Sequence, residues 1–239
     1  MTPLQDKVCI VTGAGRGIGR AIALAAAEHG CRVVLASRTA DQLEAVQAAI
    51  ELRGGQASSC SADLSSNEDL NGLVQHTLDR FGTIDYLVNN AGWGVKANVV
   101  KGKAEDWERT LRVNLLAPMI LSRLVLPTLM ARRTGAIVNV SSISGRVGQA
   151  GSAAYAASKF GLIGFSQSLF EEVREHNIKV AAILPGFVDT GMIPPVKHLD
   201  RSRMIQPEDV AQAVLFILTA PPTACPVEIT VRPQRTPYR

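Results

Sequence analysis

The 239-residue sequence has little that would mark a secreted, metal-binding or membrane-spanning protein. Its four cysteines (Cys9, Cys31, Cys60 and Cys225) show no CxxC spacing, and its four histidines are isolated. Neither a disulfide framework nor a metal site is therefore predicted. Residues 1–6 lack a signal-peptide pattern, and no apolar run reaches the roughly 18 residues that a membrane helix needs. We expect a cytoplasmic protein in a reducing compartment.

Charge is also limited and evenly spread. Charged residues make up 19% of the chain, the formal net charge is +4, and the isoelectric point is near 9.0. Lys and Arg are scattered rather than gathered in a stripe, so nothing favours a nucleic-acid partner. Hydrophobic residues make up 46% of the chain, which is enough for a large core. A chain of this length can form one large α/β unit, and we expect a single domain over residues 1–239.

Short β-branched segments alternate with longer segments of helical periodicity. Helices are expected between the strands, including long ones near 104–130 and 151–176 and one that Pro207 opens as a first-turn proline. Strands joined by such helices imply right-handed crossovers and a parallel sheet covered on both faces. The prediction is a doubly wound α/β fold with a parallel seven-stranded sheet. Its strands are predicted at 8–11, 33–35, 57–62, 84–88, 136–140, 180–184 and 227–231.

A glycine-rich turn, TGAGRGIG, follows the first predicted strand and opens a helix. Its glycines allow a tight turn and let the backbone approach a pyrophosphate, while the helix directs free N–H groups and its positive dipole end at the phosphates. This position between strand and helix favours the dinucleotide-binding turn of a Rossmann domain over a plain structural turn. The predicted binding residues of this turn are Gly13, Arg16, Gly17, Ile18 and Gly19.

The end of the second predicted strand indicates which dinucleotide binds. An acidic residue at this point would hold the ribose 2′-hydroxyl of NAD, but the sequence has Ser37 and Arg38, and the next carboxylate is Asp41. A guanidinium pairs well with a 2′-phosphate, and Arg16 could supply a second one. We therefore predict NADP(H) as the cofactor, bound in part by Ser37 and Arg38. The alternative is that both arginines are solvated loop charges.

Tyr155 and Lys159 lie four residues apart in a predicted helix, so both side chains share one face. A phenol titrates near about 10 in model peptides, and a nearby ammonium favours the phenolate. The hydroxyl then becomes a better proton donor in reduction and a better base in oxidation. Because a YxxxK pattern is common by chance, the surrounding motifs decide its meaning.

Six motifs in order resemble those of the short-chain dehydrogenase/reductase family, over nearly the full chain. Besides the glycine turn and the Tyr155–Lys159 pair, they are NNAG at 89–92, an asparagine at 114, a serine 13 residues before Tyr155, and PGFVDT at 185–190. The resemblance implies catalytic roles for Asn114, Ser142, Tyr155 and Lys159. It implies cofactor contacts for Asp63, Leu64, Asn90, Ala91, Gly92, Tyr155, Lys159, Pro185, Gly186, Val188 and Thr190.

The resemblance also implies a mechanism. Ser142 would hydrogen-bond the substrate oxygen, and Tyr155 would pass a proton to that oxygen as hydride arrives at carbon. Lys159 would hold the nicotinamide ribose and tune Tyr155. Asn114 would bind a water that links Lys159 to solvent, although it could instead be only a polar residue that bends a helix.

For the cofactor, the resemblance implies that Asp63 meets the adenine through its carboxylate, with help from the backbone of Leu64. Residues 90–92 would line the adenosine-ribose side, and Val188 and Thr190 would hold the carboxamide. The two asparagines of the NNAG motif are also expected to tie strands together.

The substrate end is less well defined by the sequence. About 15 residues separate Thr190 from Pro207, so the substrate loop, which contains Pro194 and Pro195, is short. Many family members end in an apolar strand followed by an Asp-Gly-Gly tail at a subunit interface, whereas this chain continues after residues 227–233 as a polar tail. The predicted pocket lining is Trp93, Val95, Ser144, Val147, Gln149, Phe187 and Met192. Basic residues are expected around the mouth of this pocket: Lys96, Lys101, Lys103, Arg146, Lys197, Arg201 and Arg203. They could attract an acidic carrier protein or a CoA ester, or they could simply be solvated.

Three functions remain open. The first is reduction of a carbonyl compound, with 3-oxoacyl thioesters or small ketones as substrates. The second is oxidation of a small hydroxy compound such as a sugar or hydroxy acid, and the third is a non-catalytic protein that senses NADP(H). The intact Ser142, Tyr155 and Lys159 favour an enzyme, since a pure binder needs no proton donor. We expect a small-molecule substrate, no nucleic-acid or membrane partner, and a homodimer or homotetramer assembled through the two long helices.

Overall fold

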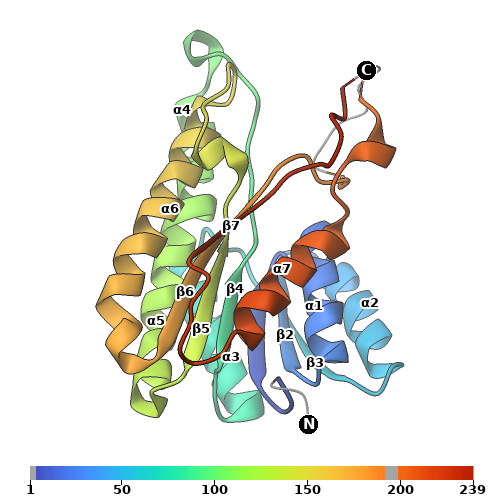
Figure 1. Ribbon diagram of the computed structural model, residues 1–239, viewed down its shortest axis with the longest axis vertical. Coiled ribbons are helices and arrows are strands. Elements are labelled where there is room, and N and C mark those ends of the chain that lie inside the picture. The colour runs from blue at the N-terminus through green and yellow to red at the C-terminus, as the bar shows by residue number, and fades with distance from the viewer. Residues whose placement is uncertain (1–3, 192–198, 239) are drawn as a thin grey trace.

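The computed structural model describes residues 4–191 and 199–238 (Figure 1). The strands in these residues are β1 (Val8–Thr12), β2 (Arg32–Ser37), β3 (Gln56–Ser61), β4 (Tyr86–Asn89), β5 (Gly135–Val140), β6 (Ile178–Pro185) and β7 (Glu228–Val231). The α-helices are α1 (Gly17–Glu28), α2 (Ala40–Glu51), α3 (Asn67–Phe81), α4 (Ala104–Leu111), α5 (Ala117–Arg132), α6 (Ala153–Val173) and α7 (Pro207–Thr219). Shorter helical turns are η1 (Val99–Lys101), η2 (Arg112–Leu116), η3 (Ile143–Gly145), η4 (Arg174–His176) and η5 (Arg201–Arg203). The predicted Met192, Pro194, Pro195 and Lys197 lie outside the described residues.

Within the described residues, seven strands form one parallel sheet in the order β3-β2-β1-β4-β5-β6-β7. The chain begins in the middle with β1, moves outward to β3, then crosses to β4 and proceeds to β7. This reversal between β1 and β4 is a topological switch point, outside which ligands of open α/β sheets bind. The predicted doubly wound, seven-stranded parallel fold is confirmed.

Two apolar layers cover the sheet, because successive side chains of a strand point to opposite faces. In β1, Cys9 and Val11 pack with residues of α1, α2 and α7, whereas Ile10 packs with residues of α3, α5 and α6. Figure 1 shows the same division of the helices between the two faces. All five residues of β1 are buried, as expected for a parallel strand covered on both sides.

The helix predicted near 104–130 is present but irregular. After α4 the chain passes through the π-helical segment η2, and α5 then continues to Arg132. By length and composition alone, residues 104–132 are long and apolar enough to cross a membrane. However, Leu121, Val125 and Leu129 are fully buried in the apolar layer beneath the sheet, which is the packing of a core helix. The predicted helix near 151–176 is α6, extended by η4 to His176.

Nothing in the sequence predicted the path of the polar tail after β7. The tail (residues 232–238) turns back towards the end of β6 and the segment at residues 199–200. The Gly186 N–H donates to the Val231 carbonyl at 2.8 Å, and the Asp200 N–H donates to the Pro237 carbonyl at 2.7 Å. Tyr238 forms an antiparallel bridge with Leu199. The two chain termini therefore lie at opposite ends of the molecule (Figure 1).

Candidate active site

The glycine turn between β1 and α1 is close-packed and leaves little room for side chains at its glycine positions. Gly13 and Gly17 have φ angles of +66° and +53°, which favour glycine. A Cβ at Gly19 would lie 2.1 Å from the Gly13 carbonyl oxygen. Arg16 precedes α1, and its side chain makes no capping hydrogen bond to the helix. The first N–H groups of α1 thus lack a side-chain cap, which is the arrangement that suits a phosphate.

The NNAG motif holds this turn against the end of β4. The Thr12 hydroxyl accepts hydrogen bonds from the N–H groups of Asn90 (3.0 Å) and Ala91 (3.1 Å). The Asn90 side chain donates to the Thr12 carbonyl at 2.9 Å. One strand over, Asn89 donates to Asn139 of β5 at 2.8 Å. The prediction that these two asparagines tie strands together is confirmed.

A cavity of about 340 Å³ lies outside the glycine turn at the β1/β4 switch point. The Asp63 carboxylate at its rim accepts hydrogen bonds from the N–H (2.9 Å) and hydroxyl (2.8 Å) of Ser65, and these bonds lower the pKa of Asp63. We call this space the nucleotide cavity. The predicted cofactor residues that line it are Gly13, Arg16, Gly17, Ile18, Gly19, Ser37, Arg38, Asp63, Leu64, Asn90, Ala91, Gly92 and Thr190.

A second cavity of about 570 Å³ adjoins the first, and we call it the catalytic cavity. The predicted residues that line it are Ser142, Tyr155, Lys159, Pro185, Gly186 and Val188, together with residues shared with the nucleotide cavity. The shared residues are Ile18, Asn90, Gly92, Thr190 and Gly191. Because both cavities share one wall, a ligand as long as a dinucleotide could extend from one into the other.

Ser142, Tyr155 and Lys159 meet in the catalytic cavity. Ser142 lies two residues after the end of β5, and its hydroxyl accepts a hydrogen bond from the Ser144 N–H at 3.1 Å. Lys159 is almost fully buried, and its ammonium donates to the Val140 carbonyl at 2.8 Å. Burial lowers the pKa of Lys159 to about 8. Its Nζ atom is 5.8 Å from the centre of the Tyr155 ring.

The predicted effect of Lys159 on Tyr155 is not seen in this structure. Burial raises the pKa of the Tyr155 phenol, and the opposing effect comes from a hydrogen bond with Ser142 rather than from Lys159. The physical reason is desolvation, which disfavours a buried phenolate. The Tyr155 phenol is thus favoured in its neutral form.

Asn114 lies in η2 and is fully buried. Its side-chain oxygen accepts the Trp93 N–H at 2.8 Å, and its side-chain nitrogen donates to the Trp93 carbonyl (2.8 Å) and the Ser158 hydroxyl (3.0 Å). Both amide hydrogens are therefore used within the protein. The residue four positions later is Pro118, which has no N–H to donate to the Asn114 carbonyl. The side-chain nitrogen of Asn114 has no hydrogen left to donate to the water that the resemblance implies.

The substrate end differs in part from the prediction. Val95, Ser144, Gln149 and Phe187 line the catalytic cavity as expected. Trp93 does not: it lines the nucleotide cavity, because Asn114 holds its backbone on that side. Val147 is 65% exposed and lines neither cavity. Both corrections concern loops whose direction depends on contacts with distant segments.

Of the six described basic residues predicted around the mouth, the three arginines pair with carboxylates. Arg146 pairs with Glu228, Arg201 with Asp189, and Arg203 with Asp200. Lys96 lines the catalytic cavity, and Lys101 and Lys103 are exposed near it in sequence. The arginines therefore stabilise the local structure around the cavity, and only the lysines remain as candidates to attract an anionic carrier.

Two contributors to the site were missed in the sequence. Tyr238 of the tail packs edge-on against Phe187, with ring centres 5.4 Å apart, and so supports a wall of the catalytic cavity. No local pattern could have indicated this, since 51 positions separate the two residues. Arg109 of α4 lines the nucleotide cavity. The sequence could have indicated this residue, because Arg109 lies about one helical turn before Val113 and Asn114 and so falls on the same side of the helix.

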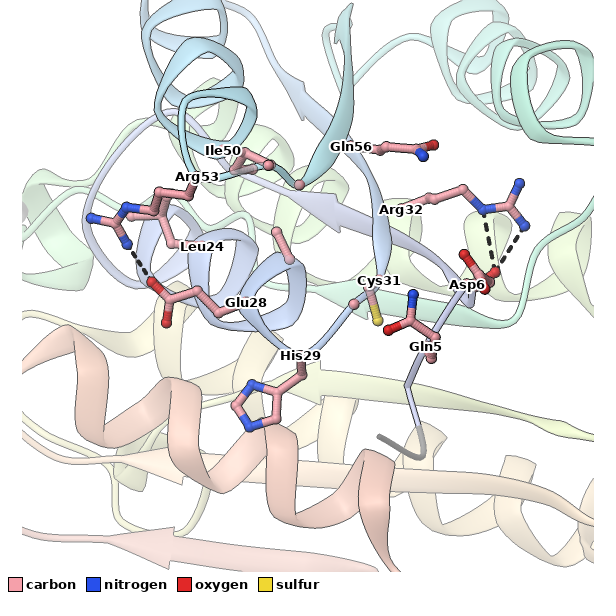
Figure 2. A pocket seen from close by; sticks show the side chains of 14 residues that line it. Gln5, Asp6, Leu24, Glu28, His29, Cys31, Arg32, Ile50, Arg53 and Gln56 are labelled. Atoms are coloured by element: carbon pink, nitrogen blue, oxygen red, sulfur yellow. Dashed lines mark hydrogen bonds and ion pairs between the residues drawn. The ribbon is translucent and has the colours of Figure 1, made fainter. Parts of the chain in front are cut away.

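A third cavity, of about 280 Å³, lies at the amino ends of β2 and β3 (Figure 2). In this cavity Glu28 pairs with Arg53, and the Arg32 guanidinium donates to the backbone carbonyl of Asp6 at 2.8 Å. The helices that border it, α1 and α2, present their C-terminal ends, which carry partial negative charge. No predicted catalytic or cofactor residue lines this cavity, and its dipoles disfavour a phosphate.

Comparison with known proteins agrees with this geometry. The family model described as short chain dehydrogenase matches residues 7–199. A 3-oxoacyl-[acyl-carrier-protein] reductase of Synechocystis is 36% identical over 231 residues, covering 94% of each chain. An uncharacterised oxidoreductase of Staphylococcus aureus is 35% identical over 233 residues, covering 98% of this chain and 100% of the relative.

Among solved structures, the crystal structure of a metagenomic short-chain oxidoreductase in complex with NADP superposes with a TM-score of 0.86 at 36% identity. The match covers 98% of this chain and 100% of the solved chain. The family match and these relatives extend over most of the sequence. The chain therefore belongs to the short-chain dehydrogenase family of oxidoreductases.

Proposed function

We propose that this oxidoreductase uses NADPH to reduce a carbonyl group to an alcohol, with Tyr155 as the proton donor. The observation that carries the proposal is the meeting of Ser142, Tyr155 and Lys159 in a 570 Å³ cavity that adjoins the nucleotide cavity. A proton donor and a dinucleotide site that share one wall are the two parts that carbonyl reduction requires.

NADP(H) is the cofactor for which the residues of the nucleotide cavity are suited. Arg16 and Arg38 line the cavity, and Ser37 ends β2 where an NAD enzyme would carry an acidic residue. Gly13 and Gly19 keep the turn open to a pyrophosphate. The NADP complex of the metagenomic relative supports this choice.

The bound cofactor would supply the hydride, and the residues of this chain would orient the substrate and supply the proton. Ser142 would hydrogen-bond the carbonyl oxygen of the substrate, and Tyr155 would donate its proton to that oxygen. The ammonium of Lys159 would return a proton to the resulting phenolate. Asn114 would hold a water that delivers protons to Lys159.

For the substrate we propose a 3-oxoacyl thioester or a small ketone. Val95, Phe187 and Ile143 give the catalytic cavity an apolar wall, and Lys96 adds a cation that would favour an anionic carrier. The Synechocystis relative, named as a 3-oxoacyl-[acyl-carrier-protein] reductase, supports this class. Oxidation of a small hydroxy compound is the alternative, since the same residues can catalyse the reverse reaction. A sensor without turnover is a weaker alternative, because the half-buried Tyr155 lines the catalytic cavity beside Ser142 and Lys159.

We further propose that the chain works as one domain in a cytoplasmic homodimer or homotetramer. Large apolar side chains are exposed on the long helices, among them Leu111, Leu116, Met119 and Phe160. Burying such side chains against a second copy would remove apolar surface from water.

Cofactor binding and turnover of the purified protein test the proposal. NADPH is expected to bind more tightly than NADH and to be consumed with one class among 3-oxoacyl thioesters, ketones, aldehydes and diketones. Tyr155→Phe should abolish turnover and leave the Kd for NADPH unchanged, and Arg38→Asp should weaken NADPH far more than NADH. Wild-type turnover by Tyr155→Phe would refute the mechanism, and equal effects of Arg38→Asp on both cofactors would remove Arg38 from the 2′-phosphate site.

A further inference from the structure

Arg109 and Trp93 form a stacked pair on the wall of the nucleotide cavity. The guanidinium carbon of Arg109 lies 5.0 Å from the centre of the Trp93 ring, within the range of a cation–π interaction. Both residues line the nucleotide cavity, together with Val113 from the same helical run as Arg109. Neither residue belongs to the motifs that predicted the cofactor site.

The backbone of Trp93 is held by the side chain of Asn114. The fully buried Asn114 side chain binds both the N–H and the carbonyl of Trp93, each at 2.8 Å. Such a two-point clamp fixes the backbone from which the indole extends, and the indole in turn offers Arg109 an aromatic face. The pair is therefore a preformed part of the cavity, which reduces the ordering cost of binding.

The charge in this cavity is unbalanced. Among the described residues that line it, the charged ones are Arg16, Arg38, Arg109 and the single carboxylate Asp63. The charges of Arg38 and Arg109 both lower the pKa of Asp63, so both guanidinium groups lie near this carboxylate. Arg109 forms no salt bridge among the described residues. One face of its guanidinium lies over Trp93, which leaves the opposite face for a ligand in the nucleotide cavity.

We propose that Arg109, held against Trp93, binds the adenine ring of NADP(H) by stacking; this rests on the cofactor assignment proposed above. Arg16 and Arg38 come from the glycine turn and the end of β2, where the 2′-phosphate is expected. Arg109 comes from α4 and lies near Asp63, the residue expected to meet the adenine. A planar, weakly hydrated guanidinium stacks well on aromatic rings, and a purine offers such a ring.

The test measures binding rather than activity. The sequence has two tryptophans, so Trp107→Phe leaves Trp93 as the sole tryptophan reporter. The ligands are NADPH, NADH and 2′-phospho-ADP-ribose, which is NADP without its nicotinamide ring. This fragment cannot absorb tryptophan emission, so a change in Trp93 fluorescence on its addition reports binding beside the indole.

In this background, Arg109→Ala is expected to raise the Kd of all three ligands by a similar factor of roughly 3 to 10. Arg109→Lys keeps the charge without the planar face and should remain weakened. Arg123→Ala removes an equally exposed arginine from α5, away from both cavities, and should change nothing.

An unchanged Kd in Arg109→Ala would overturn the proposal, as would full recovery in Arg109→Lys. A loss for NADPH and 2′-phospho-ADP-ribose with an unchanged Kd for NADH would assign Arg109 to the 2′-phosphate and also overturn the adenine assignment. Unchanged Trp93 fluorescence when 2′-phospho-ADP-ribose binds would likewise overturn the adenine assignment. Failure of the parent protein to bind any of the three ligands would appear before Arg109 is changed, and would refute the proposed function as well.

Discussion

Replacing Gly19 by alanine tests the structure of the nucleotide-binding turn directly. Gly19 lies in the first turn of α1, where a Cβ would be 2.1 Å from the Gly13 carbonyl oxygen and 2.5 Å from the Asn90 side-chain nitrogen. Ordinary contact begins near 3.4 Å, so the backbone at Gly13 must move by about 1.3 Å, the difference of the two distances. Such a movement opens the turn that is expected to hold the pyrophosphate.

The cost follows from two opposing effects. Forcing a methyl group into a close-packed site typically costs about 1–3 kcal/mol, and alanine regains up to about 1 kcal/mol over glycine within a helix. We expect Gly19→Ala to lower the free energy of unfolding by about 1–2 kcal/mol. For a chain of this size that corresponds to a fall in Tm of roughly 2–8 °C. The Kd for NADPH should rise at least about tenfold, equivalent to about 1.4 kcal/mol.

Urea unfolding and NADPH titration measure these two quantities. Gly72→Ala is the matched control, because Gly72 lies within α3 and a Cβ there would meet nothing within 4 Å. This control should gain about 0.5–1 kcal/mol and bind NADPH as the parent does. Wild-type stability together with wild-type NADPH affinity in Gly19→Ala would refute the reasoning.

Three other predictions concern the catalytic cavity. Because burial lowers the pKa of Lys159 to about 8, Lys159 loses its proton as the pH rises through 8, and the rate of NADPH-dependent reduction should fall there. Lys159→Arg, which stays charged, should lack this alkaline decline in kcat, and an unchanged decline would exclude Lys159 as its source. Asn114→Ala leaves the N–H and carbonyl of Trp93 without their partner and should lower the free energy of unfolding by about 1–3 kcal/mol, measured in urea; no loss would mean that the clamp is not stabilising. Tyr238→Ala removes the ring contact with Phe187, worth about 0.5–1.5 kcal/mol, and should change KM for the carbonyl substrate without changing the Kd for NADPH. An equal change in both constants would show that Tyr238 affects the whole site instead.

The parts of the fold that local patterns specify were predictable from the sequence. The apolar runs that became β1 and β6 are buried on both faces and so carry little besides Val, Ile, Leu, Ala and a cysteine. The glycine turn was equally clear, because its backbone geometry excludes side chains. The spacing of Tyr155 and Lys159 placed both residues on one helix face, and both line the same cavity.

Long-range contacts were not predictable in the same way. The direction of Trp93 depends on Asn114, which lies 21 positions later and uses its side chain to clamp the Trp93 backbone. The pKa of Tyr155 depends on how many atoms surround the phenol, which no i to i+4 spacing reveals. The π-helical form of η2 also escaped the 3.6-residue pattern, although Pro118 marks the place where regular hydrogen bonding must break.

The return of the C-terminal tail to the catalytic cavity has a practical consequence for handling the protein. An affinity tag or fluorescent fusion attached after Tyr238 would begin beside Phe187, at the wall of the cavity in which substrates are expected. The same addition at the N-terminus would begin at the far end of the molecule (Figure 1). Kinetic constants from C-terminally tagged protein would therefore carry the influence of the tag, whereas an N-terminal tag leaves this wall as the chain itself builds it.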